Sequence, residues 1–450
     1  MRRAAELSAE TRRLLALAWP VVLTTLNWTI LHVTDVIVVG LTGTDQVSAL
    51  GASRTLTYIT IVVALGWLSG VLVFASRADG AGDLGETGRV LHRGLAVGLV
   101  VGLASGLILF LWADPLLRLV GVEAHVVPAA AGVVRMMSFA YPFQMVGLAT
   151  SFFLEGVSRP RRVTLVNLLS LPVNAVLAWA WSGGHWGLPA WGAEGAAAAS
   201  SAASALGAAA LLVAAWTLPD AKARRVRDWS GFWSGETLGG IRRLTSFGAM
   251  PALSSGLELA GFSVLIALST QLGGTTTHAF QIVFSIHNLT FAAALGLASA
   301  AGVRVGNAVG EGVPARGAQR AAIAALLSGA TTGACALLLM AFAPVVVAAF
   351  PATAPVHAEA RWMLLLWAPF ILFDGLQAVF VYALRSLGDQ VVAGVNSILA
   401  YFVVTGGLGF GLVHAGWGAE GLVLASGGGM VVAAALHGGR LWWISRRHHS

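Results

Sequence analysis

Residues 191–216 read WGAEGAAAASSAASALGAAALLVAAW, and residues 417–436 read WGAEGLVLASGGGMVVAAAL. Both stretches begin with the same five letters, continue as an apolar run, and are offset by 226 residues. Further pairs recur in the same order at nearly the same offset: Pro142-Phe143 with Pro369-Phe370, Val166-Asn167 with Val395-Asn396, and Pro20 with Pro251. Matched residues in one order at one offset indicate an internal repeat. The sequence therefore predicts a chain of two related halves.

The composition of the whole chain indicates a membrane protein. Of its 450 residues, 57% are hydrophobic and 10% are charged, whereas ordinary soluble proteins are about 45–50% apolar and about 25% charged. So few charges cannot cover a water-facing surface of this size. Because one transmembrane helix uses about 20 apolar residues, the sequence excludes a soluble enzyme and has room for about a dozen spans.

Twelve apolar runs predict an all-α integral membrane fold with twelve transmembrane helices. The runs cover residues 14–41, 50–76, 90–113, 127–150, 163–182, 193–217, 241–271, 277–303, 317–343, 358–384, 390–413 and 419–444. Six spans in each half is an even number, so both halves enter the membrane from the same side as parallel repeats. We expect an N-terminal six-helix bundle at 1–217, a cytoplasmic linker at 218–240 and a C-terminal six-helix bundle at 241–450.

The basic residues predict the orientation of these helices. Lys and Arg in short loops stay on the cytoplasmic side, and alternate loops together with both termini carry 23 of the 27 basic residues. The opposite loops carry the other four, Arg54, Arg118, Arg135 and Arg361. Both termini are therefore predicted to be cytoplasmic, and the net charge of +7 reflects topology rather than binding to nucleic acid. Within the linker we expect a short interfacial helix bearing Trp229, Phe232 and Trp233.

Three acidic residues fall inside predicted spans and away from the span ends: Asp35, Glu258 and Asp374. An acid at the centre of a span costs about 2.5–3.5 kcal/mol on insertion scales, so three are expected to have a function. The alternative is that each acid pairs with a basic residue of a neighbouring span, but the predicted spans place no Lys or Arg at mid-membrane. We therefore expect a hydrated cation site for H⁺, or for Na⁺ at Glu258 and Asp374, because oxygen ligands suit a hard cation.

Four of the amide side chains within predicted spans are candidate supporting ligands or substrate contacts. They are Asn27, Asn174, Gln281 and Asn288. Hydrogen bonding between helices is the alternative role for each of them. Both readings place the amides inside the helix bundle.

Several motifs resemble the multidrug and toxic compound extrusion (MATE) family over essentially the whole chain. They are DVIVVG at 35–40, RVGNAVGEG at 304–312, DGLQAVFVYALRSLGD at 374–389 and the paired WGAEG segments. Within the family the chain is most similar to the NorM-like branch. That resemblance implies a span 1 aspartate at Asp35 and a cation site in the C-terminal half built on Glu258 and Asp374.

The sequence also departs from the family pattern at three positions. The DinF-like branch has an acid one turn after Asn174, where this chain has Ala178. Phe280 replaces a frequent histidine before Gln281, and Ser386 replaces a usual glycine after Arg385. These departures bear on the choice of cation and on the fine geometry of the site.

These observations predict a secondary antiporter in the inner (plasma) membrane, not an enzyme. We expect it to export cationic or amphipathic toxic compounds in exchange for H⁺ or Na⁺, by alternating access, without a cofactor and as a monomer. The alternative within the wider superfamily is an exporter or flippase of lipid-linked precursors, for which we would expect basic residues in a central cavity. An integral membrane enzyme would need a catalytic group of residues in a loop, and the loops are short.

Overall fold

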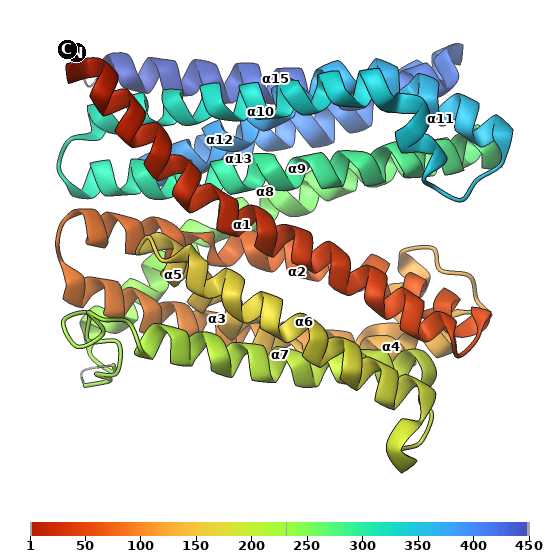
Figure 1. Ribbon diagram of the computed structural model, residues 1–450, viewed down its shortest axis with the longest axis horizontal. Coiled ribbons are helices and arrows are strands. Elements are labelled where there is room, and N and C mark those ends of the chain that lie inside the picture. Colours follow the sequence, from red (N-terminus) through yellow and green to blue (C-terminus); the bar gives the residue numbers. More distant parts are fainter. Residues whose placement is uncertain (1, 231, 448–450) are drawn as a thin grey trace. The chain divides into compact units, whose positions relative to one another are not determined.

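The computed structural model describes residues 2–230 and 232–447, and most of these residues are helical, with no β-strand among them (Figure 1). The all-α class expected from the sequence is confirmed. The helices are α1 (Arg2–Gly40), α2 (Thr44–Gly80), α3 (Leu84–Leu119), α4 (Val127–Ser138), α5 (Tyr141–Gly156), α6 (Pro160–Gly183), η1 (His185–Gly187), α7 (Gly192–Trp216), α8 (Gly235–Gln271), α9 (Gly274–Gly310), α10 (Pro314–Ala348), α11 (Ala354–Trp367), η2 (Ala368–Phe370), α12 (Ile371–Leu387), α13 (Gln390–Ser397), the π-helix η3 (Ile398–Leu408), α14 (Gly409–Leu412), the π-helix η4 (Val413–Trp417) and α15 (Gly418–Arg447).

The described helices agree with twelve membrane crossings. Ten helical stretches are long and apolar enough to cross a membrane, and one of them, Gln390–Arg447, has 58 residues. A straight helix of that length would measure about 87 Å, against about 30 Å for the hydrocarbon core. The stretch turns at Gly416 and Gly418, which have φ angles of 89° and 51°, and so crosses twice. The short helices α4 and α5, separated by two residues, together supply the remaining crossing.

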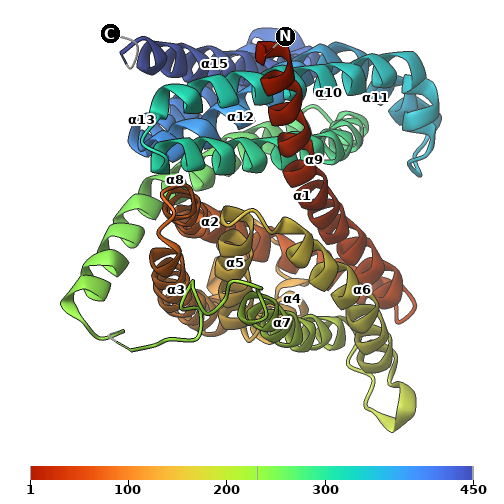
Figure 2. The same cartoon turned by 60° about the vertical axis from the view of Figure 1, so that its left-hand side comes forward.

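The chain divides into two compact units. The N-terminal unit comprises Leu23–Ala252, and the C-terminal unit comprises Met1–Val22 with Leu253–Ser450. The division falls inside α1 and inside α8, close to Pro20 and Pro251, the helix-internal prolines that the sequence repeat had paired. In the N-terminal unit, α3 packs against α2, α4 and α5, and α6 packs against α7. In the C-terminal unit, α9 packs against α10, α11 and α12, and α15 packs against α12 and η3 (Figure 2).

Both copies of the WGAEG motif mark the start of a helix. Gly192 begins α7 with a φ angle of 55°, and Gly418 begins α15 with a φ angle of 51°. Glycine adopts positive φ angles readily because it has no Cβ atom. In the first copy, Gln46 Oε1 also accepts a hydrogen bond from the backbone N–H of Ala193 at 2.9 Å. The sequence repeat is therefore also a repeat of local backbone conformation.

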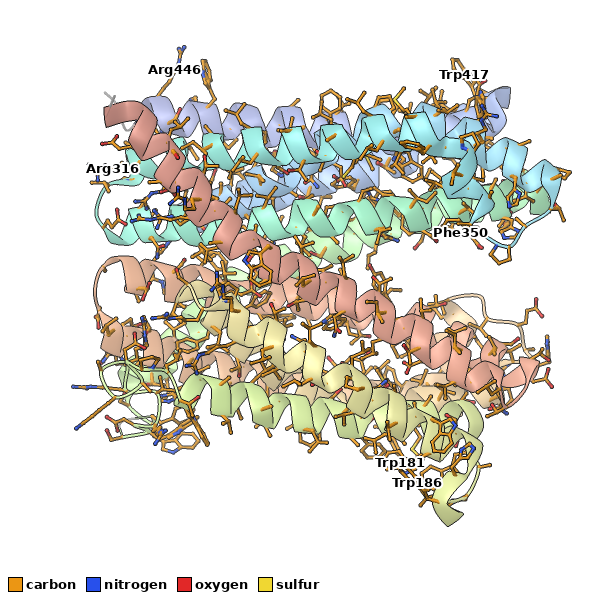
Figure 3. All side chains as sticks on the ribbon, in the orientation of Figure 1. Trp181, Trp186, Arg316, Phe350, Trp417 and Arg446 are labelled. Carbon is orange, nitrogen blue, oxygen red and sulfur yellow. The ribbon has the colours of Figure 1, made fainter. Side chains whose placement is uncertain are left out.

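The two ends of the C-terminal unit differ in their side chains. Arg316 and Arg446 lie at one end of its helices, and Trp417 and Phe350 lie at the opposite end (Figure 3). The N- and C-termini lie at the end with the arginines (Figure 1). An even number of crossings returns the chain to the side from which it started, and the positive-inside rule predicts that this side is the cytoplasm.

The linker is docked on the N-terminal unit by a buried arginine. Arg224 has a side chain that is 6% exposed and forms salt bridges of 2.8 Å with both Asp79 of α2 and Asp220. His92 of α3 donates from Nε2 to the carbonyl oxygen of Val226 at 2.9 Å. The described residues between α7 and α8 form turns, so the expected interfacial helix is wrong. These side-chain contacts hold the segment in an irregular conformation that buries Arg224.

We expect Arg224→Ala to detach the linker from α2 and α3. Because Asp79 and Asp220 still reach solvent, the linker should lose about 1–3 kcal/mol of docking free energy. A fully buried ion pair would cost more when broken. Trypsin should then cut after Lys222, Arg225 or Arg227 about tenfold to a hundredfold faster, since cleavage follows the population of locally open states.

Asp228→Ala provides the control for this experiment. The Asp228 carboxylate is exposed and bonded to Ser230, whose hydroxyl and backbone N–H lower the pKa of Asp228. It makes no salt bridge to α2 or α3 among the described residues. Its removal should leave the cleavage rate unchanged, and equal rates for the two variants would contradict the docking role of Arg224.

Candidate functional site

A buried carboxylate, Asp374, forms the centre of the candidate site in the C-terminal unit. It lies in the first turn of α12 and is 4% exposed. Its Oδ2 accepts a hydrogen bond of 2.8 Å from His287 Nε2 of α9. Its Oδ1 accepts one of 3.1 Å from Gln377 Nε2 and a longer one of 3.5 Å from the Tyr401 hydroxyl of η3. Three helical elements thus supply donors to one acid.

His287 lies in an aromatic environment. Its ring stacks on Trp367 at 5.4 Å between centroids and is flanked by Phe262, Phe284 and Phe291. Its Nδ1 is buried and has no hydrogen-bond partner among the described residues. A protonated imidazolium would carry an unsatisfied N–H at that nitrogen. Among the described residues, the His287 ring therefore makes its one hydrogen bond through Nε2, to Asp374.

Glu258 is the second acid of the C-terminal unit. It lies on α8, is partly buried and interacts electrostatically with Asp374 and Arg385. One turn further along α8, a Cβ atom on Gly261 would lie 2.1 Å from the carbonyl oxygen of Tyr401. Only glycine allows this approach of α8 to η3. The packing of the two backbones holds Glu258 and Tyr401 in the same part of the unit.

The structure separates the predicted amides of α9 from this acid. Gln281 and Asn288 are exposed, whereas Phe280, Val283 and His287 on the same helix are buried. The polar side chains that contact Asp374 are His287, Gln377 and Tyr401, which the sequence analysis missed. A lone histidine spaced three to seven residues from Phe280, Phe284 and Phe291 was the signal for a buried polar residue.

Asp35 lies in the N-terminal unit and is 5% exposed. Its Oδ1 accepts a hydrogen bond of 2.9 Å from Asn174 Nδ2 of α6. A guanidinium nitrogen of Arg54 lies 3.7 Å from its Oδ2 and also donates to the carbonyl oxygen of His32 at 2.9 Å. The predicted pair of Asp35 and Asn174 is thus in direct contact in the structure.

The expectation that the three acids lack basic partners is wrong. Arg54 reaches Asp35, His287 reaches Asp374, and Arg385 interacts electrostatically with Glu258. Arg54 was counted with the outer loop, although it lies four residues inside the predicted span 50–76. Since α2 begins at Thr44, Arg54 lies ten residues inside the helix.

Asn27 makes a contact between helices. It is 3% exposed, and its Nδ2 donates to the backbone carbonyl of Asn167 on α6 at 3.1 Å. Thr24, one turn earlier on α1, contacts Thr164 of α6 through their hydroxyls at 3.1 Å. These polar contacts join α1 to α6, the same pair of helices that carries Asp35 and Asn174.

Comparison with known proteins gives matches over almost the whole chain. The MatE family profile matches residues 20–180 and 252–409. The probable multidrug resistance protein NorM of Deinococcus radiodurans is 32% identical, and the match covers 98% of this chain and 96% of that protein. The multidrug resistance protein NorM of Vibrio cholerae is 25% identical, with 97% and 96% covered.

A solved structure shows the same fold. The crystal structure of the eukaryotic MATE transporter AtDTX14 matches with a TM-score of 0.88 at 20% identity, and the match covers 98% of both chains. The family profile accounts for more than two thirds of the residues and matches in both halves of the sequence repeat. The chain therefore belongs to the MatE family.

Proposed function

We propose that this protein is a secondary multidrug efflux antiporter that exchanges cationic or amphipathic toxic compounds for H⁺ or Na⁺. It is a multi-pass membrane transporter of the inner membrane and not an enzyme. Family membership and relatives named as multidrug resistance proteins support multidrug efflux. The proposal includes no cofactor, and each monomer contains both units needed for alternating access.

The contacts of Asp374 are the main support for cation coupling. An ionised carboxylate in the membrane is costly unless it is paired and hydrogen-bonded. Asp374 receives a short hydrogen bond from His287 Nε2, which solvates the buried carboxylate. Glu258 adds a second acid within electrostatic reach. A chamber of this kind favours an incoming cation.

Antiport follows from competition for these carboxylates. A proton or Na⁺ that binds Asp374 and Glu258 removes the negative charge that holds a cationic substrate. Conversely, a bound organic cation removes the attraction for the coupling ion. Each ligand thus promotes release of the other, and alternating access converts this competition into exchange. Asp35 with Asn174 provides a third carboxylate that takes part in the same coupling from the N-terminal unit.

Reconstitution into proteoliposomes tests the function and identifies the coupling ion. Uptake of a fluorescent organic cation such as ethidium would be followed after an imposed pH gradient and, separately, after an imposed Na⁺ gradient. We expect transport with at least one gradient and none in liposomes without protein. Absence of transport with either gradient would contradict the antiport mechanism.

The lengths of the hydrogen bonds to Asp374 predict unequal roles for its donors. His287→Phe keeps an aromatic ring but removes the hydrogen bond of 2.8 Å to Asp374. This bond stabilises the Asp374 carboxylate when neither coupling ion nor substrate is bound. Hydrogen bonds to charged groups are worth about 1.5–3 kcal/mol, so gradient-driven export should fall about tenfold to a hundredfold. Tyr401→Phe removes a bond of 3.5 Å and should cost less than about threefold, because such a bond is weak. Equal losses in transport assays would contradict this order.

A further inference from the structure

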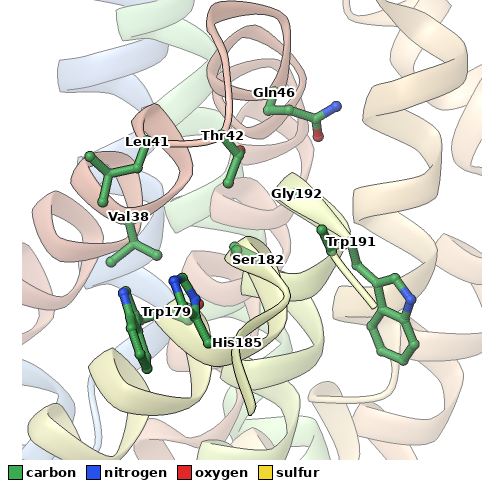
Figure 4. Close-up of a pocket in the computed structure, with 11 residues that line it drawn as sticks. Val38, Leu41, Thr42, Gln46, Trp179, Ser182, His185, Trp191 and Gly192 are labelled. Atoms are coloured by element: carbon green, nitrogen blue, oxygen red, sulfur yellow. The ribbon is translucent and has the colours of Figure 1, made fainter. Parts of the chain in front are cut away.

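A cavity of about 590 Å³ opens in the N-terminal unit at the end of α1 that is remote from the chain's N-terminus (Figure 4). Its lining comes from the ends of α1, α2 and α6 and from the first WGAEG turn. Val38 of α1 and Thr42 of the turn that follows α1 lie opposite Trp179, Ser182 and His185, with Gln46 and Trp191 beside them. No Lys, Arg, Asp or Glu lines this cavity.

Ser182 is the innermost polar group of this lining. It is 0% exposed, and its hydroxyl has no hydrogen-bond partner among the described residues. A buried hydroxyl without a partner is costly, so the cavity is expected to supply one, as water or as an ion. Further into the unit, Asn174 Oδ1 is also buried without a partner while its Nδ2 is bonded to Asp35.

These two unpartnered atoms lie on the same helix, α6, and Asp35 lies on the helix opposite. Asn174 precedes Ser182 by eight residues, and Asp35 precedes Thr42 by seven. At 1.5 Å per residue, Ser182 lies about 12 Å along α6 from the level of Asn174, whereas Val38, which also lines the cavity, lies about 4.5 Å along α1 from the level of Asp35. Between the two levels lie Val39 and Ala178, both 0% exposed. These two side chains form a buried apolar layer between the cavity and Asp35, and at position 178 this layer consists of one methyl group.

We propose that this cavity is the access portal through which a small monovalent cation, a proton or Na⁺, reaches Asp35. Ser182 is the first polar group on this route. The apolar layer of Val39 and Ala178 is the gate of the route. Beyond this layer, Asn174 contacts the ion at Asp35. Because no Lys, Arg, Asp or Glu lines the cavity, the preference for positive charge is set at Asp35 itself, whose partner Arg54 lies 3.7 Å away. The inference rests on the proposed coupling role of Asp35, but its test measures access and does not require transport.

Introduced cysteines test whether the portal is hydrated. In a Cys335→Ala background, which removes the chain's one cysteine, we expect Ser182→Cys to react with a small cationic methanethiosulfonate reagent. Val176→Cys is the control on the same helix. Val176 is 47% exposed and does not line the cavity, so we expect it to react slowly although it is far more exposed than Ser182. Should Ser182→Cys fail to fold, the exposed lining residue Thr42 takes its place as Thr42→Cys.

A matched pair of blocking variants tests the route. Ala190 is exposed and lines this cavity, and Ala415 is exposed and lines a second cavity of about 590 Å³ beside Trp417 of the other WGAEG motif. Ala190→Phe should reduce the reactivity of Ser182→Cys to that of Val176→Cys. Ala415→Phe should leave it unchanged. Equal effects of the two phenylalanines, or no effect of Ala190→Phe, would overturn the portal.

Ala178→Cys tests whether the route leads to Asp35. We expect it to react with the cationic reagent faster than with the anionic sulfonate reagent. Asp35→Asn should reduce this ratio about tenfold, as removal of a unit charge at this range predicts. If Ser182→Cys reacts but Ala178→Cys does not, the cavity does not lead to Asp35 and the proposal is overturned. If instead the ratio depends on Asp35 while Asp35→Asn still exports substrate, the portal stands and the coupling role of Asp35 fails.

Discussion

Asp374→Asn is expected to abolish gradient-driven export while leaving folded protein in the membrane. The amide keeps the shape of the side chain but cannot carry the negative charge for which coupling ion and substrate compete. Glu258→Gln should have the same effect, because Glu258 acts on the same charge balance. Export would be measured in proteoliposomes, and folding would be measured by size-exclusion chromatography and thermal unfolding in detergent.

Asp389→Asn is the matched control for this experiment. Asp389 precedes α13 and pairs with Arg440 at 2.6 Å, and both side chains reach solvent. Exposed ion pairs contribute about 0–1 kcal/mol, so this variant should transport as the wild type does. Wild-type export by Asp374→Asn and Glu258→Gln would refute the cation site in the C-terminal unit.

The second large effect is expected from Gly261→Ala. The added Cβ would lie 2.1 Å from the carbonyl oxygen and 2.8 Å from the carbonyl carbon of Tyr401. These are backbone atoms and cannot rotate away, so α8 and η3 must separate. Overpacking of this kind costs about 1–3 kcal/mol or more, and the shift also moves Glu258 away from Asp374. We expect a lower melting temperature together with loss of export.

Gly407→Ala separates this packing effect from the general effect of adding a methyl group. Gly407 lies in η3, and a Cβ atom there would meet no atom within 4 Å. Alanine also costs less backbone entropy than glycine in a helix, so stability should be unchanged or slightly higher. A Gly407→Ala variant as unstable as Gly261→Ala would show that contact between α8 and η3 is not the cause.

The helical class and the span order could be predicted because they depend on composition and on runs of about 20 residues. Asp35, Glu258 and Asp374 stood out because an acid in an apolar run is costly wherever the neighbouring helices lie. Asn174 was a candidate supporting residue because it is a polar amide in an apolar run. The structure puts it 2.9 Å from Asp35.

The partners of the acids could not be predicted because they depend on helix phase and on packing between distant segments. His287 is 87 residues from Asp374 in the sequence, and only the contact of α9 with α12 brings them together. Gln281 and Asn288 were chosen for their chemistry, but their phase on α9 exposes them. Arg54 was counted with a loop although it lies four residues inside the predicted span and ten residues inside α2.

The number of carboxylates that load a cation determines how net charge moves in each exchange. If Glu258 and Asp374 each load one monovalent cation, two positive charges move inward per cycle. Export of a monovalent drug then carries one charge back, so the exchange is electrogenic, and a membrane potential of 100 mV adds about 2.3 kcal/mol to its driving force. Export of a dication by the same site is electroneutral and draws only on the chemical gradient. The same transporter would therefore concentrate the two kinds of drug to different extents.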